Sequence, residues 1–576
     1  MKFLRIIVTA TTLNLLATCF LFAQSVFPPK KYPADNYANP IDSTISLVGN
    51  FGECRPNHFH SGMDIRTNGK ENYRLYAISD GYVSRVKIEA GGFGNAIYIT
   101  HWDGYTSVYA HMNTFFVELE TEVRQRQYKD KSWKQDIVFS PLQYPIKKRQ
   151  FIGLSGNTGS SQGPHLHMEI RNTKSEAPLN GLLFYTKLKD TKAPTLKSLA
   201  IYDGSLSVYE QKPALIPLTL KGKQFRSPSD TLYLNVPSAI LGIRGDDYME
   251  SATGTLGIYE SRLYIEDKLV FAWQLDSIGY DITRYMNAHA DYKHKKNGGT
   301  WIQFLHQLQG DQLPIYKSSS PKRGLIDLKD GKAKKVRIEC LDAYSNKSVW
   351  EAVLIGNSTT TTDTTMQCPN RFKAGKRNSW LGASIQFTLA EDALYDDFCP
   401  SITTQENATN PYSYRYKVHK ADIPIHSWFD LKLKPKQEIP LPLQEKIAIV
   451  RHPHSGESNK RGKAASYEQS WVKASVRDLG DYEIVIDRTP PTITSTIKNG
   501  DKVGAKSRIT FVVKEETTTV ATVALYLNNQ WLRLVQKGDT YYYEVDDYMP
   551  SGRHQLTLTA SDENNNTKQY TFTVTR

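Results

Sequence analysis

Residues 163–169 read Gly-Pro-His-Leu-His-Met-Glu, and this run decides how the first part of the chain folds. In a β-strand, residues i and i+2 point to the same side. His165 and His167 would therefore project together from one face of a strand. Leu166 and Met168 would point to the opposite face, where apolar side chains pack. The run predicts a strand that presents two imidazoles to a cleft.

Two other motifs upstream carry related chemistry. Residues 60–64 form an H-x-x-x-D motif, His-Ser-Gly-Met-Asp, and His111 ends the run Tyr-Ala-His. A spacing of four residues lets a helix or a strand present His60 and Asp64 on one face. Gly62 makes a helix less favourable and permits a tight backbone path.

These side chains are suited to metal chemistry. A catalytic zinc ion takes three protein ligands and keeps one position for water. His60, Asp64 and His167 would supply two imidazoles and one carboxylate, which leaves His165 and His111 for acid–base work. The residues alone do not fix which histidine has which role.

The sequence around these motifs predicts a compact, mostly antiparallel β domain over residues 45–172. Residues 82–86, 96–100 and 106–109 are candidate strands, and Asp-Gly at 103–104 is a hairpin signal. An insertion near 116–148 interrupts the pattern. Its charged part, Glu118 to Gln135, lacks β-branched runs, so we expect a helical or flexible excursion, either a solvated insertion or a lid.

The motifs and their order resemble the lysostaphin/LytM-type zinc metalloendopeptidases, a family of murein hydrolase domains. The resemblance covers less than a quarter of the chain, from about residue 45 to residue 171. The residues that carry it are Phe-Gly-Glu-Cys-Arg at 51–55, the runs at 60–64 and 109–111, Gly-Leu-Ser-Gly-Asn-Thr-Gly at 153–159, and Gly-Pro-His-Leu-His at 163–167.

The resemblance implies a role for each of five residues. His60, Asp64 and His167 match the zinc ligands of the family, one Zn²⁺ per chain, and His165 and His111 match its two catalytic histidines. The family hydrolyses peptide bonds of peptidoglycan, in stem-peptide crosslinks or in glycine bridges. The long insertion and the segments that follow depart from the family pattern, but all five positions are retained.

The remainder of the chain predicts immunoglobulin-like β-sandwich modules, so the fold class is mainly β. Asp-Thr-Lys-Ala-Pro-Thr at 190–195 and Asp-Arg-Thr-Pro-Pro-Thr at 487–492 are related segments, each between β-like runs. Alternating strands also lead into Asp/Asn turns at 342–346 and 562–566. We expect β modules at 190–356, 368–486 and 488–576, with a threonine-rich linker at 358–365.

Residues 1–23 predict a secretory signal peptide. Lys2 and Arg5 precede an apolar stretch, and Ala23 offers a small residue for cleavage. Export to the periplasm or cell envelope follows. Lipoprotein anchoring through Cys19 is a less favoured alternative, because Thr18 fits a bacterial lipobox poorly.

Composition narrows the choice of partners. The formal net charge is +13, so an acidic cell-wall polymer or a nucleic acid would be attracted. No nucleic-acid motif occurs, which favours the wall. Four cysteines lie beyond the leader, too few for a disulfide scaffold. Cys368 and Cys399 are the nearest pair, but their spacing does not establish pairing.

The sequence therefore predicts an exported zinc-dependent endopeptidase that hydrolyses peptide crosslinks of peptidoglycan. A D-Ala to diamino acid crosslink in a Gram-negative envelope is the first expectation. One alternative is a non-catalytic envelope scaffold, or an activator of another wall hydrolase, that binds through the peptidase fold. Another is a protease of folded or secreted proteins. The C-terminal modules are candidates for binding envelope proteins; the oligomeric state is not predicted.

Overall fold

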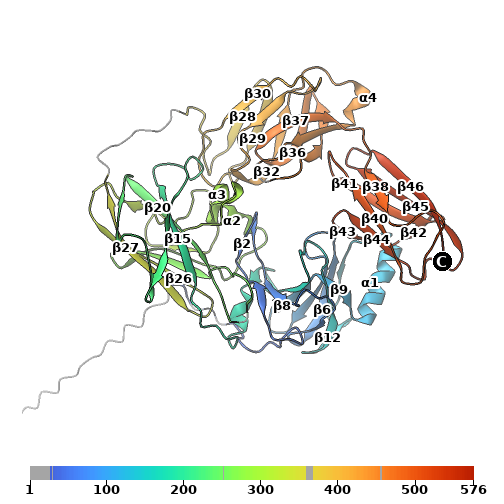
Figure 1. Cartoon of the computed structure of the whole chain (residues 1–576), viewed down its shortest axis with the longest axis horizontal. Coiled ribbons are helices and arrows are strands. Elements are labelled where there is room, and N and C mark those ends of the chain that lie inside the picture. Colours follow the sequence, from blue (N-terminus) through green and yellow to red (C-terminus); the bar gives the residue numbers. More distant parts are fainter. Residues whose placement is uncertain (1–25, 29, 31, 251, 358–367, 455–456) are drawn as a thin grey trace, which may run out of the picture.

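The computed structural model describes residues 26–28, 30, 32–250, 252–357, 368–454 and 457–576. The predicted signal peptide at 1–23, with Cys19, and the threonine-rich segment at 358–365 lie outside these residues. The described chain is mainly antiparallel β-structure, as predicted. Four successive units surround a central opening (Figure 1). None of the helices in the described ranges has the length and apolar content needed to cross a membrane.

The first unit, residues 32–185, holds a nine-stranded and a three-stranded sheet. The larger sheet has the order β1-β4-β13-β8-β7-β6-β10, with β11 beside β6 and β14 beside β13. Its strands are β1 (Leu47–Gly49), β4 (Met63–Arg66), β6 (Gly81–Ile88), β7 (Asn95–His101), β8 (Tyr105–Ala110), β10 (Gln135–Val138), β11 (Pro145–Ile146), β13 (His165–Asn172) and β14 (Pro178–Leu179). The smaller sheet and a hairpin contain β5 (Arg74–Tyr76), β9 (Met112–Phe115) and β12 (Phe151–Ser155), then β2 (Cys54–Arg55) and β3 (His58–Phe59).

Apolar residues on alternate positions of β13 hold the larger sheet to its core. Leu166, Met168 and Ile170 are buried in one cluster with residues of β4 and β6. The opposite face of β13 carries His165, His167 and charged residues. The charged part of the insertion forms helix α1 (Val117–Lys129), which buries Leu119 and Val123 against this unit. A short 3₁₀ helix, η1 (Gly181–Phe184), ends the unit.

The second unit, residues 195–356, is built from a five-stranded and an eight-stranded sheet. The five-stranded sheet contains β15 (Thr195–Asp203), β16 (Ala214–Pro217), β20 (Ser238–Asp246), β23 (Gln303–Phe304) and β25 (Ile326–Asp327). The eight-stranded sheet contains β17 (Thr219–Lys221), β18 (Gln224–Arg226), β19 (Thr231–Leu234), β21 (Glu260–Ile265), β22 (Lys268–Gln274), β24 (Tyr316–Ser318), β26 (Lys334–Leu341) and β27 (Lys347–Gly356). Between β22 and β23 lie η2 (Thr283–Tyr285), α2 (Met286–His289) and α3 (Tyr292–Lys296).

The third unit, residues 368–486, has two five-stranded sheets. They contain β28 (Asn378–Leu381), β29 (Ile385–Leu389), β32 (Pro424–Leu433), β36 (Trp471–Asp478) and β35 (Ser466–Glu468), and then β30 (Ile402–Gln405), β31 (Arg415–Val418), β37 (Gly480–Ile486), β33 (Ile447–Arg451) and β34 (Arg461–Ala464). Helix α4 (Leu441–Gln444) precedes β33. Buried residues of the second and third units form one continuous apolar cluster.

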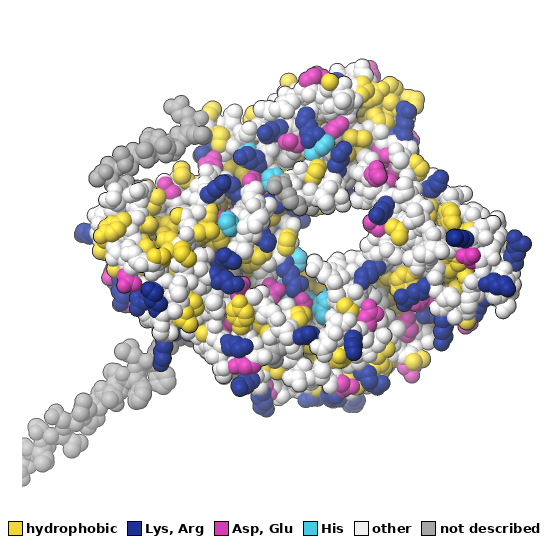
Figure 2. Space-filling view, in the orientation of Figure 1, with side chains coloured by type: hydrophobic (Ala, Val, Ile, Leu, Met, Phe, Trp, Pro, Cys, Tyr) yellow, Lys and Arg dark blue, Asp and Glu magenta, His cyan; other side chains and the backbone are white. Residues whose placement is uncertain are grey.

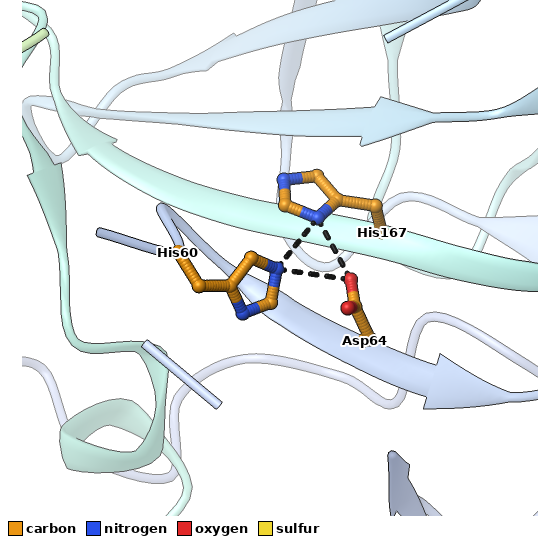
Figure 3. Close-up of side chains that lie close together, drawn as sticks. All are labelled: His60, Asp64 and His167. Carbon is orange, nitrogen blue, oxygen red and sulfur yellow. Dashed lines mark hydrogen bonds and ion pairs between the residues drawn. The ribbon is translucent and has the colours of Figure 1, made fainter. Parts of the chain in front are cut away.

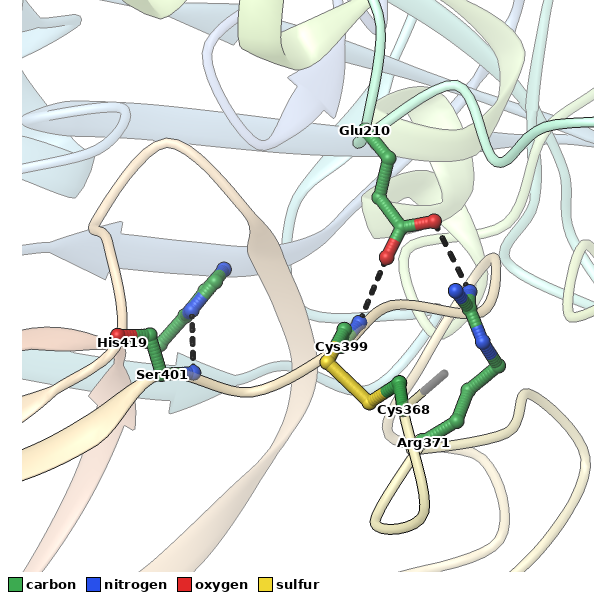
Figure 4. Close-up of a disulfide and its surroundings, with 6 residues drawn as sticks. All are labelled: Glu210, Cys368, Arg371, Cys399, Ser401 and His419. Atoms are coloured by element: carbon green, nitrogen blue, oxygen red, sulfur yellow. Dashed lines mark hydrogen bonds and ion pairs between the residues drawn. A yellow bond between two sulfur atoms is a disulfide. The ribbon is translucent and has the colours of Figure 1, made fainter. Parts of the chain in front are cut away.

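A disulfide joins Cys368 to Cys399 at the start of the third unit (Figure 4). Glu210 of the second unit accepts hydrogen bonds beside it, from the Cys399 backbone N–H at 2.8 Å and from Arg371 Nη1 at 2.9 Å. The crosslink therefore fixes the segment through which these two units meet. Of the other described cysteines, Cys54 and Cys340 are free thiols.

The fourth unit, residues 492–576, is a sandwich of two sheets around a single core. One sheet contains β38 (Thr492–Ser495), β40 (Arg508–Lys514), β44 (Thr540–Glu544) and β43 (Val535–Lys537). The other contains β39 (Asp501–Lys502), β46 (Thr567–Thr575), β45 (Arg553–Asp562), β41 (Val520–Leu527) and β42 (Gln530–Leu532).

The fourth unit returns to the first and closes a ring (Figure 1). Tyr128 of α1 stacks on Tyr548, with ring centroids 3.5 Å apart, and its hydroxyl donates to Asp546 Oδ2 at 2.7 Å. Lys537 Nζ donates to the backbone oxygen of Asn157. The space-filling view shows an open hole through the ring (Figure 2). The charged insertion thus serves as the docking element for the last unit.

The Tyr128 contact can be tested by substitution. Tyr128→Ala removes the aromatic stack, worth about 0.5–1.5 kcal/mol, and a hydrogen bond to a carboxylate, worth about 1.5–3 kcal/mol. We expect the ring to open, with a larger radius of gyration in small-angle X-ray scattering. Tyr128→Phe keeps the stack and should give an intermediate value.

Tyr233→Ala is the matched control, because Tyr233 is an exposed tyrosine on β19 of the second unit. A Tyr128→Ala scattering curve that superimposes on that of the unchanged protein would show that this contact does not hold the ring closed.

Candidate metal centre

Strand pairing brings the candidate residues together from distant parts of the sequence. In the antiparallel ladder between β4 and β13, His167 lies directly opposite Asp64. On its other side β13 pairs with β8, where His167 lies opposite Ala110, the residue before His111. His60 lies three residues before the first residue of β4, and its imidazole contacts Asp64.

Three donor atoms converge at this point (Figure 3). His167 Nδ1 lies 2.8 Å from Asp64 Oδ1, and His60 Nε2 lies 3.1 Å from each of these two atoms. All three residues are buried. Donors bound to one tetrahedral zinc ion at about 2.0–2.1 Å would be about 3.3 Å apart, so this set fits a single ion.

In His60 and His167, the ring nitrogen that faces away from the donor cluster lies beside a hydrogen-bond acceptor. His60 Nδ1 donates to the Asn50 backbone oxygen at 2.7 Å, so its Nε2 presents a lone pair to the cluster. His167 Nε2 lies 3.1 Å from Glu169 Oε1. Metal-binding histidines characteristically donate their second N–H to a carbonyl or carboxylate, which orients the ring and raises its basicity. Both rings are therefore oriented as metal ligands.

Electrostatics keep the carboxylates at this site ionised. Burial alone would raise the pKa of Asp64, but its histidine neighbours, His60 foremost, hold it well below the usual range. Arg55 Nη2 also donates to Asp64 Oδ2 at 2.8 Å. Burial alone would lower the pKa of His167, yet hydrogen bonds to Asp64 and Glu169 raise it to about 9. A proton therefore competes with a metal ion for Nδ1 of this histidine.

Glu169 is the anchor of a supporting network that the sequence reasoning missed. Its side chain is fully buried and accepts from Arg171 Nε at 2.6 Å and from the hydroxyl of Tyr280. Burial opposes ionisation, but Arg171 and His167 lower the pKa of Glu169 to about 2. Tyr280 belongs to the second unit, so a neighbouring unit helps to orient His167.

The two remaining histidines lie beside the donor cluster. His165 Nε2 is 3.4 Å from Asp64 Oδ1, and its Nδ1 lies 2.8 Å from the Gly163 oxygen. His111 packs against His165 with ring centroids 4.8 Å apart, and its Nδ1 donates to the Thr158 oxygen at 2.8 Å. Burial, followed by His167 and His165, lowers the pKa of His111 to about 3. The structure thus brings all five sequence-predicted residues into one site.

Comparison with known proteins agrees with this geometry. Residues 58–128 match Peptidase family M23, and residues 369–487 match the Zu5-like domain. The resemblance to lysostaphin/LytM-type peptidases is confirmed, because residues 58–128 of the first unit match Peptidase family M23. The Zu5-like match falls on the third unit.

The curated relatives match about a fifth to a quarter of the chain. An uncharacterized metalloprotease of Haemophilus influenzae is 32% identical over 129 residues, 22% of this chain and 21% of its own length. The DD-carboxypeptidase/endopeptidase Mpg of Neisseria meningitidis serogroup B is 30% identical, covering 19% of this chain and 20% of its own. The murein hydrolase activator NlpD of Salmonella dublin is 31% identical, covering 26% and 32%. The chain thus spans about a fifth of the length of the first two relatives.

Solved structures also match about a quarter of the chain. The catalytic domain of lysostaphin from Staphylococcus simulans is 25% identical and covers 24% of this chain and 90% of that chain, with a TM-score of 0.17. A zinc-containing peptidase from Vibrio cholerae is 26% identical and covers 26% and 38%, also with a TM-score of 0.17.

The role of Glu169 can be separated from that of the donors. Glu169→Gln keeps the shape of the side chain but removes the charge that accepts from His167. We expect affinity for Zn²⁺ to fall about 10–100-fold, measured by competition with a chromophoric chelator. Glu176→Gln, an exposed glutamate just beyond β13, is the matched control and should bind as the unchanged protein does. Equal affinity in the Glu169 and Glu176 variants would contradict this role.

Proposed function

We propose that this chain is an exported zinc-dependent endopeptidase that hydrolyses peptide crosslinks of peptidoglycan. The observation that carries the proposal is the convergence of His60 Nε2, Asp64 Oδ1 and His167 Nδ1, with two further imidazoles beside them. The Peptidase family M23 match and the Mpg relative support the reaction class. The disulfide fits an oxidising compartment, which supports export to the periplasm or envelope.

His60, Asp64 and His167 would hold the zinc ion, one per chain. When bound, zinc supplies Lewis acidity, which makes water a better nucleophile near neutral pH and polarises a peptide carbonyl. Asn50 and Glu169 keep the two imidazoles turned inward.

His165 is the proposed general base. Its Nδ1 proton is held by the Gly163 carbonyl, so its Nε2 lone pair faces the donor cluster and can accept a proton from the attacking water. His111 is neutral in this site and is protonated on the side of Thr158. To donate to the carbonyl oxyanion, His111 would need a proton on Nε2 as well. The proton that His165 takes from the attacking water is the source of that proton, and it then passes to the leaving amine. His111 could exchange the role of base with His165.

One relative supports a second candidate function. NlpD is named a murein hydrolase activator, and three units of this chain lie outside the peptidase domain. In that case the ring would bind another wall hydrolase and cut nothing itself. The retained donor set and both additional histidines favour the enzyme.

Digestion of crosslinked sacculi tests the proposal. We expect soluble muropeptides, detected by mass spectrometry, that disappear when the protein is stripped of zinc. His167→Ala should abolish both zinc binding and hydrolysis. His165→Ala should retain zinc and lose about 10²–10⁴-fold in rate, because the base is gone and the donors remain.

His452→Ala is the matched control, because His452 lies in the third unit and pairs with Glu483. Binding to sacculi without any fragments would favour the activator function. Cleavage of casein but not of sacculi would favour a protease of other proteins. Full hydrolysis by the zinc-free His167 variant would rule out the zinc mechanism.

A further inference from the structure

Two acidic clusters far from the peptidase site are built to one plan. Asp190, Asp247 and Asp342 each place a carboxylate oxygen within 4.8 Å of the other two. A second set, Asp487, Glu515 and Asp562, does the same. The first cluster belongs to the start of the second unit, and the other to the start of the fourth.

The members of the two clusters occupy equivalent places in the fold. Asp190 precedes the first strand of the second unit, and Asp487 precedes the first strand of the fourth, each ahead of a proline-containing segment. The middle members directly follow a strand, Asp247 after β20 and Glu515 after β40. The last members lie at the tip of a hairpin: Asp342 directly follows β26, and Asp562 is the last residue of β45. The related sequence segments therefore place three carboxylates in the same arrangement in both parts of the chain.

An asparagine holds the last carboxylate in the same way in both clusters. Asn346 donates through its backbone N–H and its Nδ2 to the Asp342 carboxylate, at 2.8 and 2.7 Å, and its Nδ2 also donates to the Asp190 backbone oxygen at 3.2 Å. Asn566 makes the corresponding bonds to the Asp562 carboxylate, both at 2.8 Å, and to the Asp487 backbone oxygen at 3.0 Å. The carboxylates are therefore preorganised at close range.

Each cluster also contains a buried carboxylate oxygen without a partner. Asp247 Oδ1 and Asp487 Oδ2 are inaccessible and accept no hydrogen bond, in side chains that are each 2% exposed. Buried polar groups are nearly always paired, and an unpaired buried carboxylate is costly. Burial and the neighbouring Asp342 and Asp190 raise the pKa of Asp247 to about 8. Each cluster therefore lacks a partner that several of its carboxylate oxygens could contact at once.

No protein cation fills that role within the described ranges. No ion pair within 4.0 Å links a lysine, arginine or histidine to any of the six carboxylates there. Lys192 and Lys446 exert only a longer-range attraction, on Asp190 and Asp487. The donor set is entirely oxygen, which suits a hard cation such as Ca²⁺ better than zinc, since zinc sites combine any carboxylate with nitrogen or sulfur ligands.

We propose that each cluster is a Ca²⁺ site, so that the chain binds two calcium ions in addition to any metal at the peptidase centre. Asp190, Asp247 and Asp342 bind one ion, and Asp487, Glu515 and Asp562 bind the other. The unpartnered oxygens of Asp247 and Asp487 become ligands. Each ion neutralises carboxylates that otherwise repel one another.

Both sites lie where one unit meets the next. Near the first, the hydroxyl of Tyr344 donates to the Tyr185 oxygen of the first unit at 3.0 Å. Near the second, Asn564 Nδ2 donates to the Ile447 oxygen of the third unit at 2.9 Å. Bound calcium would therefore stiffen two junctions of the ring.

Equilibrium dialysis of the full chain with ⁴⁵Ca²⁺ tests this inference. Calcium sites in extracellular modules bind at about 10⁻⁴–10⁻³ M, so titration to about 5 mM free Ca²⁺ covers the range. We expect two ions per chain, one in Asp247→Asn, one in Asp487→Asn and none in the double variant. Asp539→Asn, an exposed aspartate of the fourth unit, should keep both ions.

Thermal melting gives an independent readout, because the effect of calcium on Tm should differ between the unchanged protein and the Asp→Asn variants. Calcium should raise the Tm of the unchanged protein, because it binds the folded state alone. Without calcium, the two Asp→Asn variants should melt no lower than the unchanged protein, because an amide keeps the shape of the side chain and carries no charge that the neighbouring carboxylates could repel. The double variant should gain nothing from calcium. His60→Ala should keep both calcium ions, so this result does not depend on the peptidase centre. Absence of calcium binding to the unchanged protein, or two ions in the double variant, would overturn the proposal.

Discussion

The antiparallel register between β4 and β13 is the constraint on which the peptidase site depends. It sets Asp64 opposite His167, although the two residues are far apart in the sequence. A slip of one residue would turn the imidazole of His167 to the other face of the sheet. Leu166 and Met168, both fully buried, prevent such a slip because they would then face solvent. Packing of the apolar face therefore fixes the chemistry of the polar face.

Much of this arrangement could be predicted from short-range patterns. The alternation in residues 165–168 is sufficient to place two imidazoles on one face. The lack of β-branched runs in the insertion indicated a helical or flexible excursion, and the structure shows that the helical alternative holds for α1. The mainly β fold class and the family resemblance are confirmed. The individual roles of the five site residues stay predictions.

The supporting network was harder to predict, for physical reasons. Glu169 follows His167 by two residues on the same strand, so the same periodicity could have identified it. Asn50 acts through a backbone oxygen, and Tyr280 arrives from another unit, so neither leaves a local sequence signal. Which nitrogen of each imidazole faces inward depends on these partners. Pairing of Cys368 with Cys399 likewise depends on tertiary approach, which spacing alone does not reveal.

Closure of the ring has a consequence for the order of biogenesis. Tyr548 and Lys537 lie near the carboxyl end, whereas their partners Tyr128 and Asn157 lie in the first unit. Because synthesis starts at the amino end, all residues of the donor set are made long before the strands of the fourth unit, which close the ring. Nascent chains, and fragments clipped between the third and fourth units, would therefore carry the complete donor set without the contacts that close the ring.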